Sequence, residues 1–163
     1  MSAQQRETRQ PASITAPAIV MGAGIGGFVD GIFAHQIFQW HGMLTQLYPN
    51  TTMENMERNM FADGLFHLVT LSFVLAGLYL LWARVPRGAW RWTGRSLTGW
   101  MLAGWGLFNL IEGTLNHHLL QLHRVNPEAA NPLAWDVGFL LLGALLIVGG
   151  SLLARSDTPR ESA

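Results

Sequence analysis

Residues 137–154 read VGFLLLGALLIVGGSLLA, an apolar run that contains no ionisable side chain. A transmembrane helix needs about 20 consecutive, mostly apolar residues, so this run predicts a membrane span at 135–154. Three further windows have a similar character, at 17–40, 64–83 and 97–120. Acidic residues and histidines interrupt the first and third windows, but apolar residues surround them on all sides. We therefore interpret all four windows as membrane spans rather than as amphipathic helices of a soluble bundle.

The composition supports a membrane protein and excludes several other classes. Of 163 residues, 50% are hydrophobic and 12% are charged, and ten basic residues balance ten acidic ones. A nucleic-acid-binding protein needs a basic face, so we expect no nucleic-acid partner. Without cysteine, the chain can form neither disulfides nor thiolate metal sites. Seven Trp and 18 Gly fit a multi-pass protein of the cell (inner) membrane in contact with the lipid bilayer.

The arginines predict the orientation of the spans. Eight of the ten lie before the first span, between the second and third spans, or after the fourth, namely Arg6, Arg9, Arg84, Arg87, Arg91, Arg95, Arg155 and Arg160. The positive-inside rule then places both termini in the cytoplasm. We expect an all-α fold, a four-transmembrane-helix bundle in which residues 16–155 form a single membrane domain. The polar segments 1–15 and 156–163 would be cytoplasmic tails, the first of them disordered.

Histidines and acids gather toward the outer side in this topology. All six histidines fall in the outer half of the membrane or at its rim, with four carboxylates beside them: His35, His41, His67, His117, His118, His123, Asp30, Asp63, Glu112 and Asp136. An ionised group inside a membrane costs several kcal/mol unless it is paired or ligated. These acids are therefore candidate functional residues.

An internal repeat relates the two halves of the chain. A shift of 82 residues brings the first span onto the third, and both then share the pattern G-x-G-x5-[DE]-G-x3-H-x3-Q-x-H. With a slightly different offset Asp63 pairs with Asp136, each just before an apolar span. The matching positions are polar residues and glycines, so chance similarity of apolar sequence does not explain them. We predict two parallel two-helix repeats, 16–84 and 96–155, related by an axis along the membrane normal.

Imidazoles and carboxylates that converge on such an axis would form a nitrogen and oxygen ligand shell, which suits copper, iron or zinc. The candidate ligands are His35, His67, His117, His118, Asp30, Asp63, Glu112 and Asp136. We expect His35 and His117, which are repeat partners at equal depth, to be the principal ones.

Four further residues are predicted to support the site rather than to ligate the metal. His41 and His123 lie farther out along an ideal helix, where water would compete for an ion. We assign them an entry or outer-shell role and expect His41→Ala to lower occupancy less than His35→Ala. Gln39 and Gln121 would orient the deeper histidines.

Three functions fit this pattern. The first is a metal-binding protein with a mononuclear or dinuclear site, which handles copper or, as a metal-dependent oxidoreductase, supports redox chemistry with a redox or metal-delivery partner. Methionines at 43, 53, 56 and 60 favour copper, because thioethers prefer Cu(I); they would otherwise form the apolar face of a short helix. The second is a b-type haem protein with His35 and His117 as axial ligands. The third is a proton or cation carrier that uses Asp30 and Glu112.

Three motifs resemble a known family. They are GAGIGGFVDGIFAHQIFQWHGML at 22–44, ADGLFH at 62–67, and FNLIEGTLNHHLLQLH at 108–123 followed by WD at 135–136. Together they are similar to the bacterial four-span membrane family known as domain of unknown function 2243. The likeness covers nearly the whole chain between the tails. It implies a four-span membrane fold and no particular activity.

Overall fold

The computed structural model describes residues 13–84 and 92–156. The described residues contain four α-helices: α1 (Thr15–Asp30), α2 (Met53–Arg84), α3 (Gly94–Glu112) and α4 (Pro132–Arg155). Two of them continue directly into a π-helix, α1 into η2 (Gly31–Ile37) and α3 into η3 (Gly113–Leu119). No strand occurs in these residues, which confirms the predicted all-α class. Most of the two predicted tails and of the arginine-rich connection lies outside the described residues.

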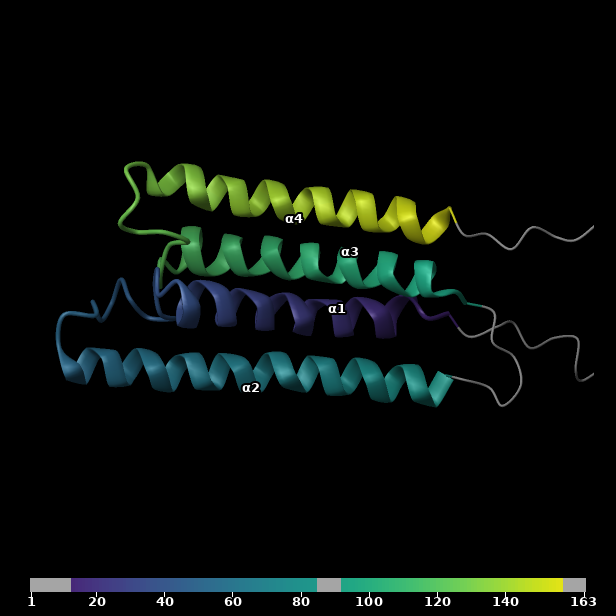
Figure 1. Ribbon diagram of the computed structural model, residues 1–163, viewed down its shortest axis with the longest axis horizontal. Coiled ribbons are helices and arrows are strands. Elements are labelled where there is room, and N and C mark those ends of the chain that lie inside the picture. The colour runs from purple at the N-terminus through teal and green to yellow at the C-terminus, as the bar shows by residue number, and fades with distance from the viewer. Residues whose placement is uncertain (1–12, 85–91, 157–163) are drawn as a thin grey trace, which may run out of the picture.

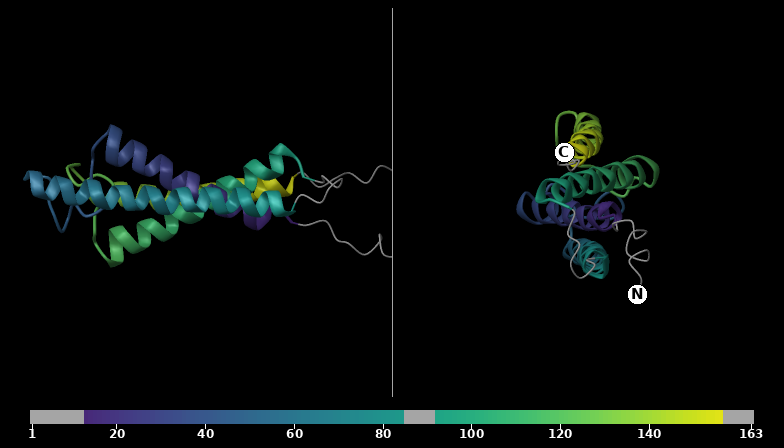
Figure 2. Two further views of the ribbon diagram at one scale, coloured as in Figure 1. Left: turned by 90° about the horizontal axis from the view of Figure 1, so that it is seen from below. Right: turned by 90° about the vertical axis from the view of Figure 1, so that its right-hand side faces the viewer.

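The four helices lie in one row, in the order α2, α1, α3, α4 (Figure 1). Helix α1 contacts α2 and α3, and α3 contacts α4 as well, whereas α2 and α4 do not touch within the described parts of the chain. Seen from below, α1 and α3 cross one another (Figure 2). The two repeat-related helices are therefore the centre of the molecule, and α2 and α4 flank them.

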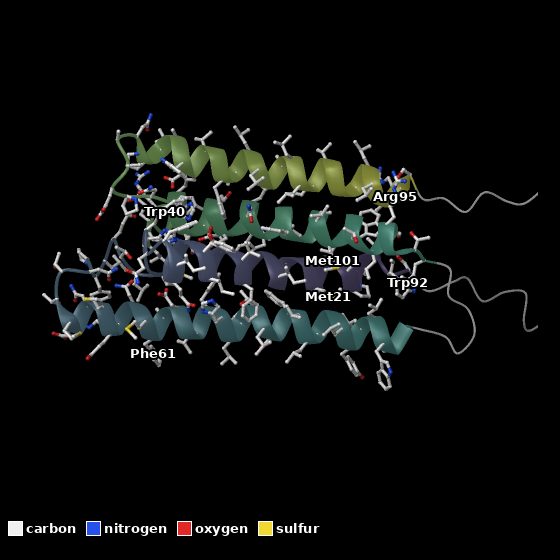
Figure 3. All side chains as sticks on the ribbon, in the orientation of Figure 1. Met21, Trp40, Phe61, Trp92, Arg95 and Met101 are labelled. Atoms are coloured by element: carbon white, nitrogen blue, oxygen red, sulfur yellow. The ribbon has the colours of Figure 1, made fainter. Side chains whose placement is uncertain are left out.

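Two glycines permit the crossing of α1 and α3. A Cβ atom added at Gly22 would overlap the carbonyl group of Met101, and one added at Gly104 would overlap that of Ile19. Met21 and Met101 mark this part of the two helices in Figure 3. Such close backbone approach is typical of membrane helices that pack through small residues. The two contacts are equivalent under the 82-residue shift, since Gly22 matches Gly104 and Ile19 matches Met101.

Three helices are long and apolar enough to cross a membrane: Thr15–Ile37, Met53–Ala83 and Pro132–Arg155. The expected span at 97–120 is not among them, because polar side chains lower the mean hydropathy of α3, which lies at the centre of the row. Of these, Asn109 is 1% exposed and Glu112 is 4% exposed. Helix α3 nevertheless runs alongside the other three (Figure 1), and the four-span topology stays a prediction. The outward faces of α2 and α4 suit contact with lipid, since they expose large apolar side chains such as Leu68, Phe73, Leu75, Leu141, Leu145 and Leu152.

The chain reverses sharply after each π-helix. Gln39 and Gln121 both have a positive φ, 52° and 48° respectively, a left-handed conformation that is uncommon for a residue with a side chain. The turn brings His41 and His123 back toward the helix they have just left. Both turns lie at the same end of the helix bundle. Helices α1 and α3 begin, and α2 and α4 end, at the opposite end of the bundle (Figure 1).

Candidate metal centre

Four imidazole rings gather where the two reversed turns meet. Ligand atoms of His35, His41 and His123 lie within 4.8 Å of one another, and so do those of Glu112, His117 and His123. His123 belongs to both groups. The His41 and His123 rings stack with centroids 4.5 Å apart and an interplanar angle of 9°. The candidate ligands therefore form one continuous cluster built from both halves of the chain.

Backbone carbonyls determine which nitrogen of each turn histidine is free. Nδ1 of His41 lies 2.8 Å from the carbonyl oxygen of Val125, and Nδ1 of His123 lies 3.1 Å from that of Met43. A carbonyl oxygen can only accept, so each Nδ1 carries the proton and each Nε2 of the neutral ring carries a lone pair. Burial lowers the pKa of His41, and the neighbouring His123 lowers it further. His41 is thus a neutral ring with Nε2 available as a ligand.

Asp63 of α2 holds the His35 ring from behind. Its Oδ1 lies 2.8 Å from His35 Nδ1 and also accepts a hydrogen bond of 2.8 Å from the backbone N–H of Met43. Since a carboxylate accepts, Nδ1 is protonated and Nε2 faces the other way, 3.6 Å from Asp30 Oδ2. A carboxylate behind an imidazole is the usual means of orienting a metal-binding histidine. Asp63 therefore supports His35 rather than pointing into the cluster itself.

Asp136 of α4 has the corresponding position in the second half. Its Oδ1 lies 3.5 Å from His117 Nδ1 and accepts from the backbone N–H of Val125 at 3.0 Å. Its other oxygen accepts a hydrogen bond of 2.7 Å from Arg124. The guanidinium balances the charge of a carboxylate that is fully buried. On the opposite side of the His117 ring, Nε2 lies 3.3 Å from Glu112 Oε2.

Several buried polar atoms of the cluster make no hydrogen bond within the described residues, although some lie close to an opposite charge. The Nε2 atoms of His35, His41 and His123 are buried without a hydrogen bond, and so is Oε2 of Glu112. His123 Nε2 lies 2.9 Å from Glu112 Oε1, but the contact lacks hydrogen-bond geometry. Leaving one buried donor or acceptor unsatisfied costs about 1–3 kcal/mol. One cation bound by these atoms would satisfy them together, so the donor set fits a metal ion.

The positions of His41 and His123 differ from those expected at a water-accessible rim. They are 3% and 0% exposed, so the expectation that water competes for an ion there was wrong. It assumed a straight helix that continues outward, whereas the chain turns back at Gln39 and Gln121. The two glutamines are exposed, and Gln39 lines a cavity together with His35 and His41, so their predicted role in orienting the histidines stays a prediction.

His67 and His118 lie outside both ligand groups in the described structure. Each has a buried Nε2 without a hydrogen-bond partner, and His67 Nδ1 bonds the backbone carbonyl of Asp63 on its own helix. Asp30 contacts His35 but is only partly buried. The supporting role of the backbone at 43 and 125 was not among the predictions, although these positions are also 82 residues apart.

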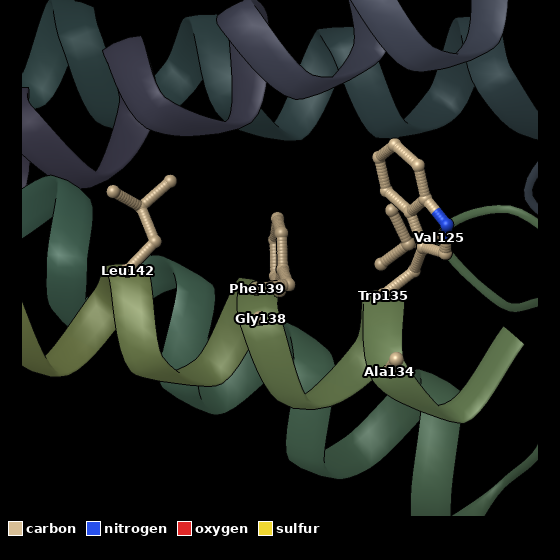
Figure 4. A pocket seen from close by; sticks show the side chains of 6 residues that line it. All are labelled: Val125, Ala134, Trp135, Gly138, Phe139 and Leu142. Atoms are coloured by element: carbon tan, nitrogen blue, oxygen red, sulfur yellow. The ribbon is translucent and has the colours of Figure 1, made fainter. Parts of the chain in front are cut away.

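An apolar cavity of about 470 Å³ lies beside the cluster, along α4 (Figure 4). Its lining consists of Val125, Ala134, Trp135, Gly138, Phe139 and Leu142. Phe139 also packs against the His117 ring, with centroids 5.4 Å apart. No ionisable side chain lines the cavity, so it supplies no metal ligand and suits an apolar occupant such as a lipid chain.

The fold and the cluster define a helical membrane protein with a buried histidine and carboxylate centre that could hold a metal ion. The chain belongs to the family described as predicted membrane protein (DUF2243), whose model matches residues 17–157. No curated protein and no solved structure matches the chain.

Proposed function

We propose that this protein of the cell inner membrane binds a transition-metal ion, copper above all, in the cluster at the outer end of its helices. The observation that carries the proposal is the convergence of three buried Nε2 atoms, none of which makes a hydrogen bond, beside a buried carboxylate. The proposed ligands are His35, His41, His117, His123 and Glu112. Asp63 and Asp136 orient imidazoles from behind, and Asp30 supports His35.

The proposed centre holds a single ion. Nδ1 of His123 is occupied by the carbonyl of Met43, so its Nε2 is the one nitrogen that can ligate. A single lone pair serves one metal at a time, and His123 belongs to both ligand groups. If two ions were bound, only one of them could take His123, and the other would have only two ligands from its own group.

We further propose that the ion lies on the axis of two parallel repeats. The supporting contacts occur in equivalent pairs: His41 bonds the carbonyl at 125 while His123 bonds the carbonyl at 43. Likewise Asp63 accepts from the backbone N–H at 43 and Asp136 from that at 125. Each half thus completes the site of the other, which would make the centre dependent on the correct packing of α1 against α3.

The geometry favours this function over a haem protein. His35 and His117 would have to face each other across a porphyrin, but the His123 ring lies 5.7 Å from the first and 4.8 Å from the second. That ring occupies space that a porphyrin between them would need. Bound copper would supply one-electron chemistry, and an imidazole and carboxylate shell also suits zinc and iron.

A proton or cation carrier remains the alternative, because Asp30 and Glu112 each lie against a histidine, at 3.6 and 3.3 Å. A relay through these pairs requires no tightly bound metal. Metal retention therefore separates the two functions.

Metal analysis of the purified protein in detergent tests the proposal. We expect close to one ion per chain in the natural protein, a loss of most of it in His123→Ala, and full retention in His118→Ala. His118 is the matched control, since it also has a buried unpartnered Nε2 but lies outside both groups. Circular dichroism would verify that each variant keeps its helices. Equal occupancy in all three proteins, or no metal in any, would contradict the proposal and favour the carrier.

A further inference from the structure

A second cavity connects the metal centre with the surface on the first half of the chain. Its volume is about 360 Å³, and its lining includes His35 and His41 together with Met56 and Met60 of α2. The two histidines are buried, at 6% and 3% exposure, whereas Met56 is 44% and Met60 is 70% exposed. The cavity therefore has imidazoles at its inner end and thioethers at its outer end.

Met56 and Met60 are exposed apolar side chains in residues 53–63 of α2, a stretch that is mostly polar. They are four residues apart in a helix, so they lie one above the other on the same face. A methionine pair at this spacing normally packs in a core, but neither is buried here. Thioether sulfur is a soft ligand that prefers Cu(I) to zinc or to hard cations. The pair is thus placed and suited to receive Cu(I) from the aqueous side.

The second half of the chain has no counterpart of this pair. The shift of 73 residues that relates Asp63 to Asp136 places Ala129 and Leu133 opposite Met56 and Met60. Neither can ligate a metal. The repeat therefore does not require methionine at these positions, which separates the pair from the packing that both halves share.

We infer that Met56 and Met60 form an entry site that takes up Cu(I) and passes it to His41 and His35. This inference rests on the proposed function. The transfer is a ligand exchange in which a copper–sulfur bond breaks as a copper–nitrogen bond forms. The copper is neither oxidised nor reduced. His41 releases no proton, because its proton is on Nδ1, bonded to the carbonyl of Val125, and Nε2 already has its lone pair. His35 lies between two carboxylates, Asp30 and Asp63, and any proton on its Nε2 would pass to Asp30 as the copper–nitrogen bond forms.

The double variant Met56→Leu with Met60→Leu tests the entry site, since leucine nearly conserves the volume of methionine. Metal-free purified protein would be mixed anaerobically with Cu(I) buffered by a chromophoric chelator, and separately with Zn(II). We expect Cu(I) to load about tenfold more slowly, which corresponds to an increase of about 1.4 kcal/mol in the activation free energy of loading. Zinc loading and the final Cu(I) occupancy should be unchanged. Met53→Leu is the matched control, because Met53 is 71% exposed on the same helix but does not line the cavity.

The outcomes distinguish this inference from the proposed function. If the natural protein takes up neither metal, the metal centre itself is wrong and the entry site falls with it. If the double variant loads Cu(I) as fast as the natural protein, the entry site alone is wrong. Should the double variant also lose zinc, the two single variants would be compared, and unslowed Cu(I) loading in both would overturn the inference.

Discussion

Replacing Asp63 by asparagine tests whether the carboxylate behind His35 strengthens metal binding. Its Oδ1 lies 2.8 Å from both His35 Nδ1 and the backbone N of Met43. Asparagine keeps an oxygen in this place and removes the charge. Hydrogen bonds to charged groups contribute about 1.5–3 kcal/mol and neutral ones about 0.5–1.5 kcal/mol, so the bond to His35 should weaken by about 1 kcal/mol. We expect metal affinity to fall about fivefold.

Alanine at the same position removes the oxygen as well as the charge. Loss of an outer partner of a metal-binding histidine typically costs about 10- to 100-fold in affinity, so Asp63→Ala should bind more weakly than Asp63→Asn. Competitive titration of each purified variant against a chelator measures its metal affinity. Glu57→Gln is the control, since this carboxylate on the same helix is exposed and belongs to neither ligand group. Unchanged affinity in both Asp63 variants, or an equal loss in the control, would refute the reasoning.

Two further predictions concern the packing and the orientation of the helices. Gly104→Ala should lower stability by about 1–3 kcal/mol, because the added methyl group would overlap the carbonyl of Ile19. Gly138→Ala is the control, because a Cβ added at Gly138 has no atom within 4 Å, and it should stabilise α4 by up to about 1 kcal/mol. Identical thermal unfolding of the two variants in detergent would contradict the close crossing of α1 and α3. In this cysteine-free chain, Asn50→Cys should react with an impermeant maleimide in intact spheroplasts, and Ser156→Cys only after lysis. The reverse labelling pattern would show that the protein has the opposite orientation in the membrane.

The helices could be predicted because apolar length is a local property. The run at 137–154 lies inside α4 (Pro132–Arg155), and the window at 64–83 lies inside α2 (Met53–Arg84). Helix α2 begins about three turns before its window, because residues 53–63 are helical but mostly polar. Hydropathy also does not report which helices touch. The single row with α1 and α3 at its centre therefore could not be predicted from the windows.

The members of the cluster could be predicted from the repeat, but their depth could not. Matching polar positions in the two halves singled out His35, His117 and Glu112. The positions of His41 and His123 were extrapolated along a straight helix, and the left-handed turns at Gln39 and Gln121 depend on tertiary contacts that a straight extrapolation ignores.

The roles of the aspartates depend on the direction in which each imidazole faces. Nδ1 of His35 points to Asp63, and this orientation follows from how α2 packs against the end of α1. Sequence spacing alone leaves a ligand and an orienting carboxylate indistinguishable, which is why Asp63 and Asp136 were expected among the ligands.

X-ray absorption spectroscopy of the metal retained by the purified protein tests the central claim most directly. We expect a first shell of nitrogen and oxygen ligands, with the multiple-scattering pattern of at least three imidazoles. His123→Ala should lose one imidazole from this shell or lose the metal altogether, whereas His118→Ala should leave the spectrum unchanged. A shell of oxygen atoms without imidazole scattering, or a spectrum unaffected by His123→Ala, would contradict the account.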